Sequence, residues 1–108
     1  MGPVEPRSAL ERVLLIAWRD TLADQSLGIE DDFLSSGGDS VLATRVVANL
    51  REALQSDDVR VRDVFTARTV AALAKTMVGA DPRWEEIAAI SLEVSALTED
   101  ELELQLRD

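Results

Sequence analysis

The sequence contains no cysteine and no histidine, and aromatic residues make up only 4% of its 108 positions. Without cysteine, a disulfide framework and a thiolate metal site are excluded, which is the pattern of a cytoplasmic protein. No apolar run reaches the roughly 18 residues of a membrane span. No charged and then apolar signal segment opens the chain. We therefore expect one small cytoplasmic domain with a modest helical core, and neither a membrane segment nor a secretory signal.

Charge is strongly biased to one sign, with a net charge of −10. This argues against nucleic-acid binding, which requires clustered Lys and Arg to neutralise phosphates. The bias is uneven, because residues 81–108 hold 9 acidic and 2 basic side chains, whereas residues 1–80 hold 12 and 9. Acidic loop residues such as Asp31 and Asp32 lack the spacing of metal ligands, so we expect no metal site. The last quarter of the chain is expected to be a separate acidic tail.

Apolar residues recur at helical rather than strand spacing, which predicts an all-α fold. The pattern predicts four helices, beginning at about residues 8, 40, 61 and 69. The third is a single short turn. Three begin at a capping residue, namely Ser8, Asp39 and Thr69, and Ser8 with Glu11 forms a capping box. The fold class is therefore predicted to be a four-helix bundle with one short helix.

Two further regions carry weaker patterns. Four apolar residues in the polar segment 23–36 are expected to pin it to the core: Leu27, Ile29, Phe33 and Leu34. Trp18 occupies a stripe position and is expected to be a core residue. After residue 81 helical spacing returns, and Thr98 with Glu101 forms a second capping box. The final alternation of Leu and acidic residues is compatible with a short helix or with a strand.

The most informative motif is Gly37-Gly38-Asp39-Ser40, which sets one exposed serine between a glycine turn and a helix. A serine nucleophile needs a base, and the commonest one, histidine, is absent. The glycine spacing also lacks the second glycine of the hydrolase elbow. The motif therefore predicts no catalytic residue here, and it favours a serine that is modified over one that attacks. A serine hydrolase fragment and a noncovalent helical adaptor are the alternatives from other classes.

With its neighbouring blocks, this motif resembles a peptidyl carrier protein (thiolation) domain of nonribosomal peptide synthetases, within the phosphopantetheine-dependent carrier proteins. The resemblance covers about residues 8–78 and rests on the order of its blocks. These blocks are Leu10-Glu11-Arg12-Val13-Leu14 with Trp18, Asp31-Asp32-Phe33-Leu34-Ser35-Ser36-Gly37-Gly38-Asp39-Ser40, Leu42-Ala43-Thr44-Arg45, Val61-Arg62-Asp63-Val64-Phe65 and Thr69-Val70-Ala71-Ala72-Leu73-Ala74. Residues 1–7 then correspond to a linker, 8–80 to the carrier domain and 81–108 to the acidic tail.

The resemblance implies a covalent cofactor and a set of partners. A phosphopantetheinyl transferase would attach 4′-phosphopantetheine from coenzyme A to Ser40, with Gly37, Gly38 and Asp39 forming the loop that it reads. The arm would carry aminoacyl or peptidyl thioesters between adenylation and condensation domains, or an epimerisation or thioesterase domain. The isolated domain would be a non-catalytic monomer. An aryl or acyl carrier of a siderophore or polyketide line is the alternative within this class.

Two sets of residues are expected to contact partners. By analogy with the family, the first set surrounds the serine and consists of Val41, Leu42, Arg45 and Phe65. The second lies in the acidic tail and consists of Leu102, Leu104 and Leu106. The tail is interpreted either as a docking element for a downstream synthetase subunit or as a linker, and the sequence leaves both open.

Overall fold

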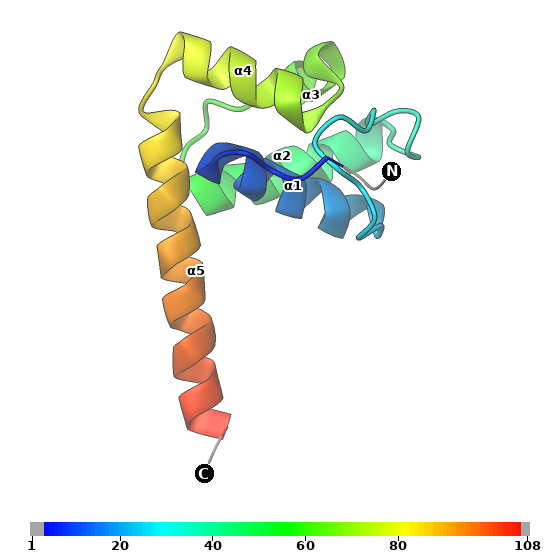
Figure 1. Cartoon of the computed structure of the whole chain (residues 1–108). Coiled ribbons are helices and arrows are strands. Elements are labelled where there is room, and N and C mark those ends of the chain that lie inside the picture. The colour runs from blue at the N-terminus through cyan, green and yellow to red at the C-terminus, as the bar shows by residue number, and fades with distance from the viewer. Residues whose placement is uncertain (1–3, 107–108) are drawn as a thin grey trace.

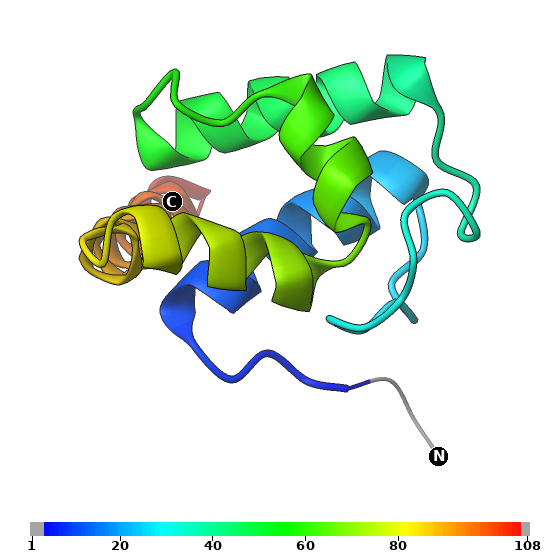
Figure 2. The same cartoon turned by 90° about the horizontal axis from the view of Figure 1, so that it is seen from above.

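The computed structural model describes residues 4–106, with side chains described for residues 4–95. Its helices are α1 (Ala9–Leu22), α2 (Ser40–Leu54), α3 (Val61–Ala67), α4 (Val70–Ala80) and α5 (Trp84–Leu106). Within residues 4–106 there is no strand, which confirms the all-α prediction and the short third helix. Figures 1 and 2 show α1, α2 and α4 gathered around one core, while α5 runs down one end of the bundle and extends beyond it.

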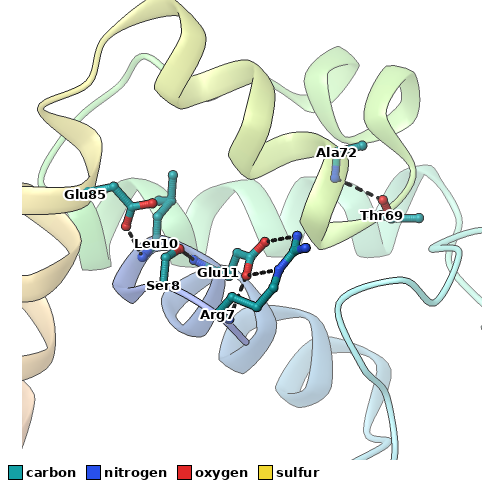
Figure 3. Close-up of polar contacts among 7 residues, drawn as sticks. All are labelled: Arg7, Ser8, Leu10, Glu11, Thr69, Ala72 and Glu85. Carbon is teal, nitrogen blue, oxygen red and sulfur yellow. Dashed lines mark hydrogen bonds and ion pairs between the residues drawn. The ribbon is translucent and has the colours of Figure 1, made fainter. Parts of the chain in front are cut away.

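Local capping explains where three of the helices begin. The Ser8 hydroxyl accepts a hydrogen bond from the Glu11 N–H at 3.2 Å, and Thr69 does the same for the Ala72 N–H at 3.1 Å (Figure 3). Asp39 caps α2 in the same way. Each cap contributes about 1 kcal/mol. The predicted capping box at Ser8 is only half formed, because the Glu11 carboxylate accepts from the backbone and guanidinium of Arg7 instead of the Ser8 N–H.

The core is built from the apolar stripes of the helices. Trp18 is fully buried, as expected, and its ring meets that of Phe33 edge-on, with the centroids 5.5 Å apart. The largest other buried side chains come from α1, α2, α3, α4 and the long loop: Leu10, Leu14, Leu15, Ile29, Val46, Leu50, Val64, Val70 and Leu73. Two aromatic rings that meet edge-on, as those of Trp18 and Phe33 do, stabilise the fold by about 0.5–1.5 kcal/mol beyond the hydrophobic effect of burying them. The Trp18–Phe33 pair therefore ties the long loop to the centre of the bundle.

The loop between α1 and α2 is held down by apolar and polar contacts. Phe33 donates its N–H to the Arg68 carbonyl at 2.7 Å, and the Asp32 carboxylate pairs with the Arg68 guanidinium at 2.7 Å. The Ala71 N–H donates to the Ile29 carbonyl at 2.9 Å. The prediction for Leu34 is wrong, since this side chain is 41% exposed. Its neighbour Phe33 takes the space on the core, and the chain turns Leu34 outward.

Helix α5 differs from the segment that the sequence predicted. It is one continuous helix of 23 residues, so the backbone at Thr98 continues a helix and begins none. The open choice between helix and strand is resolved as helix up to Leu106. Its first turns belong to the core, because Trp84 is 7% exposed and Ala88 is fully buried. The Glu85 carboxylate also accepts a hydrogen bond from the Leu10 N–H at 2.9 Å, which joins α5 to the first turn of α1 (Figure 3). The packed core thus continues past residue 80, and the boundary of an independently folding domain stays a prediction.

Over the described residues, no helix is both long and apolar enough to cross a membrane.

Candidate functional site

Ser40 is the first residue of α2 and its side chain is exposed. The preceding Asp39 accepts a hydrogen bond from the Leu42 N–H at 2.9 Å, and the Ser40 carbonyl accepts one from the Thr44 hydroxyl at 2.9 Å. Within residues 4–95, no side chain or backbone group hydrogen-bonds the Ser40 hydroxyl. The backbone at Ser40 is therefore held by the first turn of a helix, while its hydroxyl is left open to solvent.

Gly37 and Gly38 each occupy a position that disfavours a side chain, for two different physical reasons. Gly37 has φ +101°, a conformation that residues with a Cβ rarely adopt. Gly38 donates its N–H to the Phe33 carbonyl at 2.9 Å. A Cβ at Gly38 would lie 2.5 Å from Cδ1 of the Phe33 ring, 2.6 Å from the Phe33 carbonyl oxygen, and also too close to Cε1. The turn that presents Ser40 is therefore pressed against the buried Phe33 ring and leaves no room for a side chain.

The loop is anchored on its other side by Asp32. Its carboxylate accepts from the Ser35 N–H at 2.9 Å and pairs with Arg68, which is itself in the left-handed region with φ +68°. The Ser35 N–H, followed by the Arg68 guanidinium, lowers the pKa of Asp32 below its ordinary value. Asp32 is consequently charged at neutral pH, and it links the turn before Ser40 to the connection between α3 and α4.

The side chains predicted to surround the serine divide into two kinds. Val41 is 65% exposed, and Arg45 is also exposed on α2. Leu42 and Phe65 are half-buried and pack against the core. The exposed Leu34 was missed as a surface residue, although the adjacency of Phe33 and Leu34 was a signal, since a loop seldom buries two successive large side chains. The side chains of Leu102, Leu104 and Leu106 lie outside the described residues.

The Ser40 hydroxyl is accessible for covalent attachment of another group. The acid that precedes the serine, Asp39, uses its carboxylate as the cap of α2. Residues 4–95 hold no group of three or more His, Cys, Asp or Glu side chains arranged to bind a metal ion. The exposed hydroxyl fits a covalent cofactor supplied from outside, because the surrounding backbone needs no movement to present it. A phosphoryl group on that oxygen would also be at the positive end of the α2 dipole.

The helical fold, taken together with a family match, defines the class of protein to which this chain belongs. Residues 12–77 match the family described as "Phosphopantetheine attachment site". The chain belongs to this family of phosphopantetheine-carrying domains, and its cofactor is 4′-phosphopantetheine. The match places it among domains that are generally non-catalytic.

Similar proteins narrow the class to carriers of nonribosomal peptide synthetases. The phenyloxazoline synthase MbtB of Mycobacterium tuberculosis is 44% identical over 98 residues, which is 86% of this chain and 7% of that protein. One component of the linear gramicidin synthase of Brevibacillus parabrevis is 40% identical over 76 residues, 70% of this chain and 2% of that protein. A solved structure described as a nonribosomal PCP domain is 32% identical with a TM-score of 0.59, covering 67% of this chain and 91% of that one. The chain thus spans less than a tenth of these two curated relatives. It is a carrier domain of the nonribosomal peptide synthetase type.

Proposed function

We propose that Ser40 is the residue that receives the 4′-phosphopantetheine arm. The observation that carries this proposal is its exposed hydroxyl, without a hydrogen-bond partner in residues 4–95, at the first position of α2. A phosphopantetheinyl transferase would form the bond between the Ser40 oxygen and the phosphorus that bears the pantetheine. The pyrophosphate bond of coenzyme A breaks, adenosine bisphosphate leaves, and the serine proton passes to a base of the transferase.

The loaded domain would hold aminoacyl or peptidyl groups as thioesters without catalysing their transfer. In support, Ser40 has no base poised to activate it within residues 4–95. The arm acts as a tether that raises the effective concentration of the bound group at successive active sites. We expect adenylation and condensation domains, or an epimerisation or thioesterase domain, to contact Val41, Leu42, Arg45 and Phe65. An aryl or acyl cargo remains the alternative, and a cytoplasmic location remains a prediction.

Intact-mass spectrometry tests the attachment site. The full chain is incubated with coenzyme A, magnesium and a broad-specificity transferase, beside Ser40→Ala and the matched control Ser35→Ala. Ser35 is an exposed serine in the same loop. We expect one phosphopantetheine increment in the wild type and in Ser35→Ala, and none in Ser40→Ala. An increment retained by a folded Ser40→Ala protein would rule out this site and direct the search to another serine.

We further propose that the acidic segment 81–108 docks with a downstream synthetase subunit. Its support is the length of α5, which extends beyond the bundle (Figure 1), and the acidic surplus in this segment. Deleting everything after Gly79 would also remove Trp84 and Ala88 from the core, so a full-length variant is the better test. Neutralising Glu99, Glu101 and Glu103 to Gln should slow transfer to the downstream subunit and leave loading of the arm unchanged. Unchanged transfer would favour a plain linker.

A further inference from the structure

A groove of about 800 Å³ lies between the C-terminal end of α2 and the first three turns of α5, on a face of the domain that the attachment site does not use. Its apolar lining comes largely from Ile87, Ile90 and Val94, which follow one another at i, i+3 and i+7 on a single face of α5. Ile90 is 53% exposed and Val94 is 55% exposed. Two large aliphatic side chains in one groove are therefore left open to solvent beside the core.

The rim of this groove is acidic. Glu52, Asp58 and Glu86 line it, and none of them has an ion-pair partner within residues 4–95. The one basic side chain of the lining, Arg83, is paired with Asp81 at 2.9 Å, so it does not offset the other carboxylates. The C-terminal end of α2 adds the negative end of a helix dipole. The groove thus combines an apolar floor with an uncompensated negative rim.

These features select one kind of occupant. A second copy of the chain would bring a net charge of −10 and the same acidic rim against this one, and like charges oppose that contact. An anionic membrane surface or a nucleic acid is disfavoured by the same sign of charge. A groove between two helices accepts the apolar face of a third helix. Basic flanking residues on that helix would meet the acidic rim.

We propose that the groove between α2 and α5 binds a basic amphipathic helix of a partner polypeptide. The inference rests on the docking part of the proposed function and is independent of attachment at Ser40. It extends the recognition surface from the acidic end of the chain to a groove formed by α5 and the body of the carrier. The apolar row Ile87, Ile90 and Val94 would anchor the partner, and Glu52 with Asp58 would select its charge.

The test uses the full chain and a synthetic helical peptide of about 18 residues, long enough to populate a helix. Leu residues at i, i+3 and i+7 form its apolar row and Lys residues flank it. A second peptide carries Glu in place of Lys. Fluorescence anisotropy measures the Kd of each. We expect the Lys peptide to bind at least about tenfold more tightly than the Glu peptide, a difference of about 1.4 kcal/mol.

Variants locate the site. Ile90→Glu should raise the Kd of the Lys peptide by about tenfold or more. The matched control Ile16→Glu changes an isoleucine of α1 that is 47% exposed and lies outside the groove lining, and it should leave the Kd unchanged. The double variant Glu52→Lys with Asp58→Lys should reverse the preference and favour the Glu peptide. Far-UV circular dichroism confirms that each variant is folded.

Four outcomes would overturn the inference. Equal binding of the two peptides would show that the rim does not select charge. A dimer at working concentration that Ile90→Glu disperses would assign the groove to a second copy. Binding that survives Ile90→Glu, but is lost when Glu99, Glu101 and Glu103 are neutralised, would place docking on the acidic end alone. That last result would refute binding in the groove but would still support docking by residues 81–108. Binding that is insensitive to both sets of variants would refute both proposals.

Discussion

Replacing Gly38 with Ala tests why the turn before Ser40 contains two glycines. The added Cβ would lie 2.6 Å from the Phe33 carbonyl oxygen and 2.5 Å from Cδ1 of its ring. Rotation of the ring could relieve the second contact but not the first, because the carbonyl belongs to the backbone. That carbonyl also accepts the Gly38 N–H at 2.9 Å. The loop must therefore shift at the point where it is attached to the core.

The magnitude follows from the two ways in which the loop can respond. If Phe33 stays in place, overpacking costs about 1–3 kcal/mol, and the strained or lost hydrogen bond adds about 1 kcal/mol. If the Phe33 ring is released instead, its lost burial costs about 1.5–3 kcal/mol. Both routes predict that Gly38→Ala lowers the free energy of unfolding by about 2–3 kcal/mol.

Two other glycines provide controls for the same substitution. Gly37 has open space around its Cα but a φ of +101°, so Gly37→Ala should cost about 1–2 kcal/mol in backbone strain without moving Phe33. Gly79 lies inside α4 with open space, so Gly79→Ala should stabilise by roughly 0.5 kcal/mol through helix propensity. The predicted loss of stability is therefore largest for Gly38→Ala and smaller for Gly37→Ala. Gly79→Ala should instead raise the stability.

Urea unfolding followed by circular dichroism measures these free energies, and the indole N–H resonance of Trp18 reports displacement of the ring that it contacts. Gly38→Ala should move that resonance, and Gly37→Ala should not. A Gly38→Ala protein within about 0.5 kcal/mol of the wild type, with an unmoved Trp18 signal, would refute the argument that Phe33 excludes a side chain at this position. A larger cost for Gly37→Ala than for Gly38→Ala would refute the assigned order.

Three further predictions concern the helix caps and α5. Asp39→Ala should cost about 1 kcal/mol of stability by removing the cap on the Leu42 N–H, whereas Asp39→Asn should restore most of it in thermal unfolding. The Arg7 hydrogen bond lowers the pKa of Glu11, so this pair stabilises the fold above the ordinary glutamate pKa of about 4.3 and the contribution is lost as pH falls below it. In urea titrations, the stability gap between the wild type and Glu11→Gln should accordingly narrow as pH falls below the ordinary glutamate pKa and vanish once the lowered pKa of Glu11 has been passed. A gap that stays constant over that acid range would contradict this. Trp84→Ala should cost about 3–5 kcal/mol, since the side chain is buried with the core, and a cost below about 1 kcal/mol would show that α5 does not belong to the folding unit.

Sequence patterns determined the parts of this protein that depend on neighbours in the chain. Helical spacing and the caps at Ser8, Asp39 and Thr69 act over three or four residues, so they predicted α1, α2 and α4 and the burial of Trp18 without tertiary information. The glycine turn and its serine are equally local, and so the candidate site was predicted by residue number.

Only the tertiary structure decided which groups meet across the bundle. Phe33 explains the absence of a side chain at Gly38, and it turns Leu34 outward. The Glu85 carboxylate accepts a hydrogen bond from the Leu10 N–H, 75 positions away in the chain. The neighbouring Trp84 is buried in the core, although the sequence analysis assigned the carrier domain to residues 8–80. Such choices depend on competition for space and hydrogen-bond partners between segments that are distant in the chain, and local periodicity carries no information about that competition.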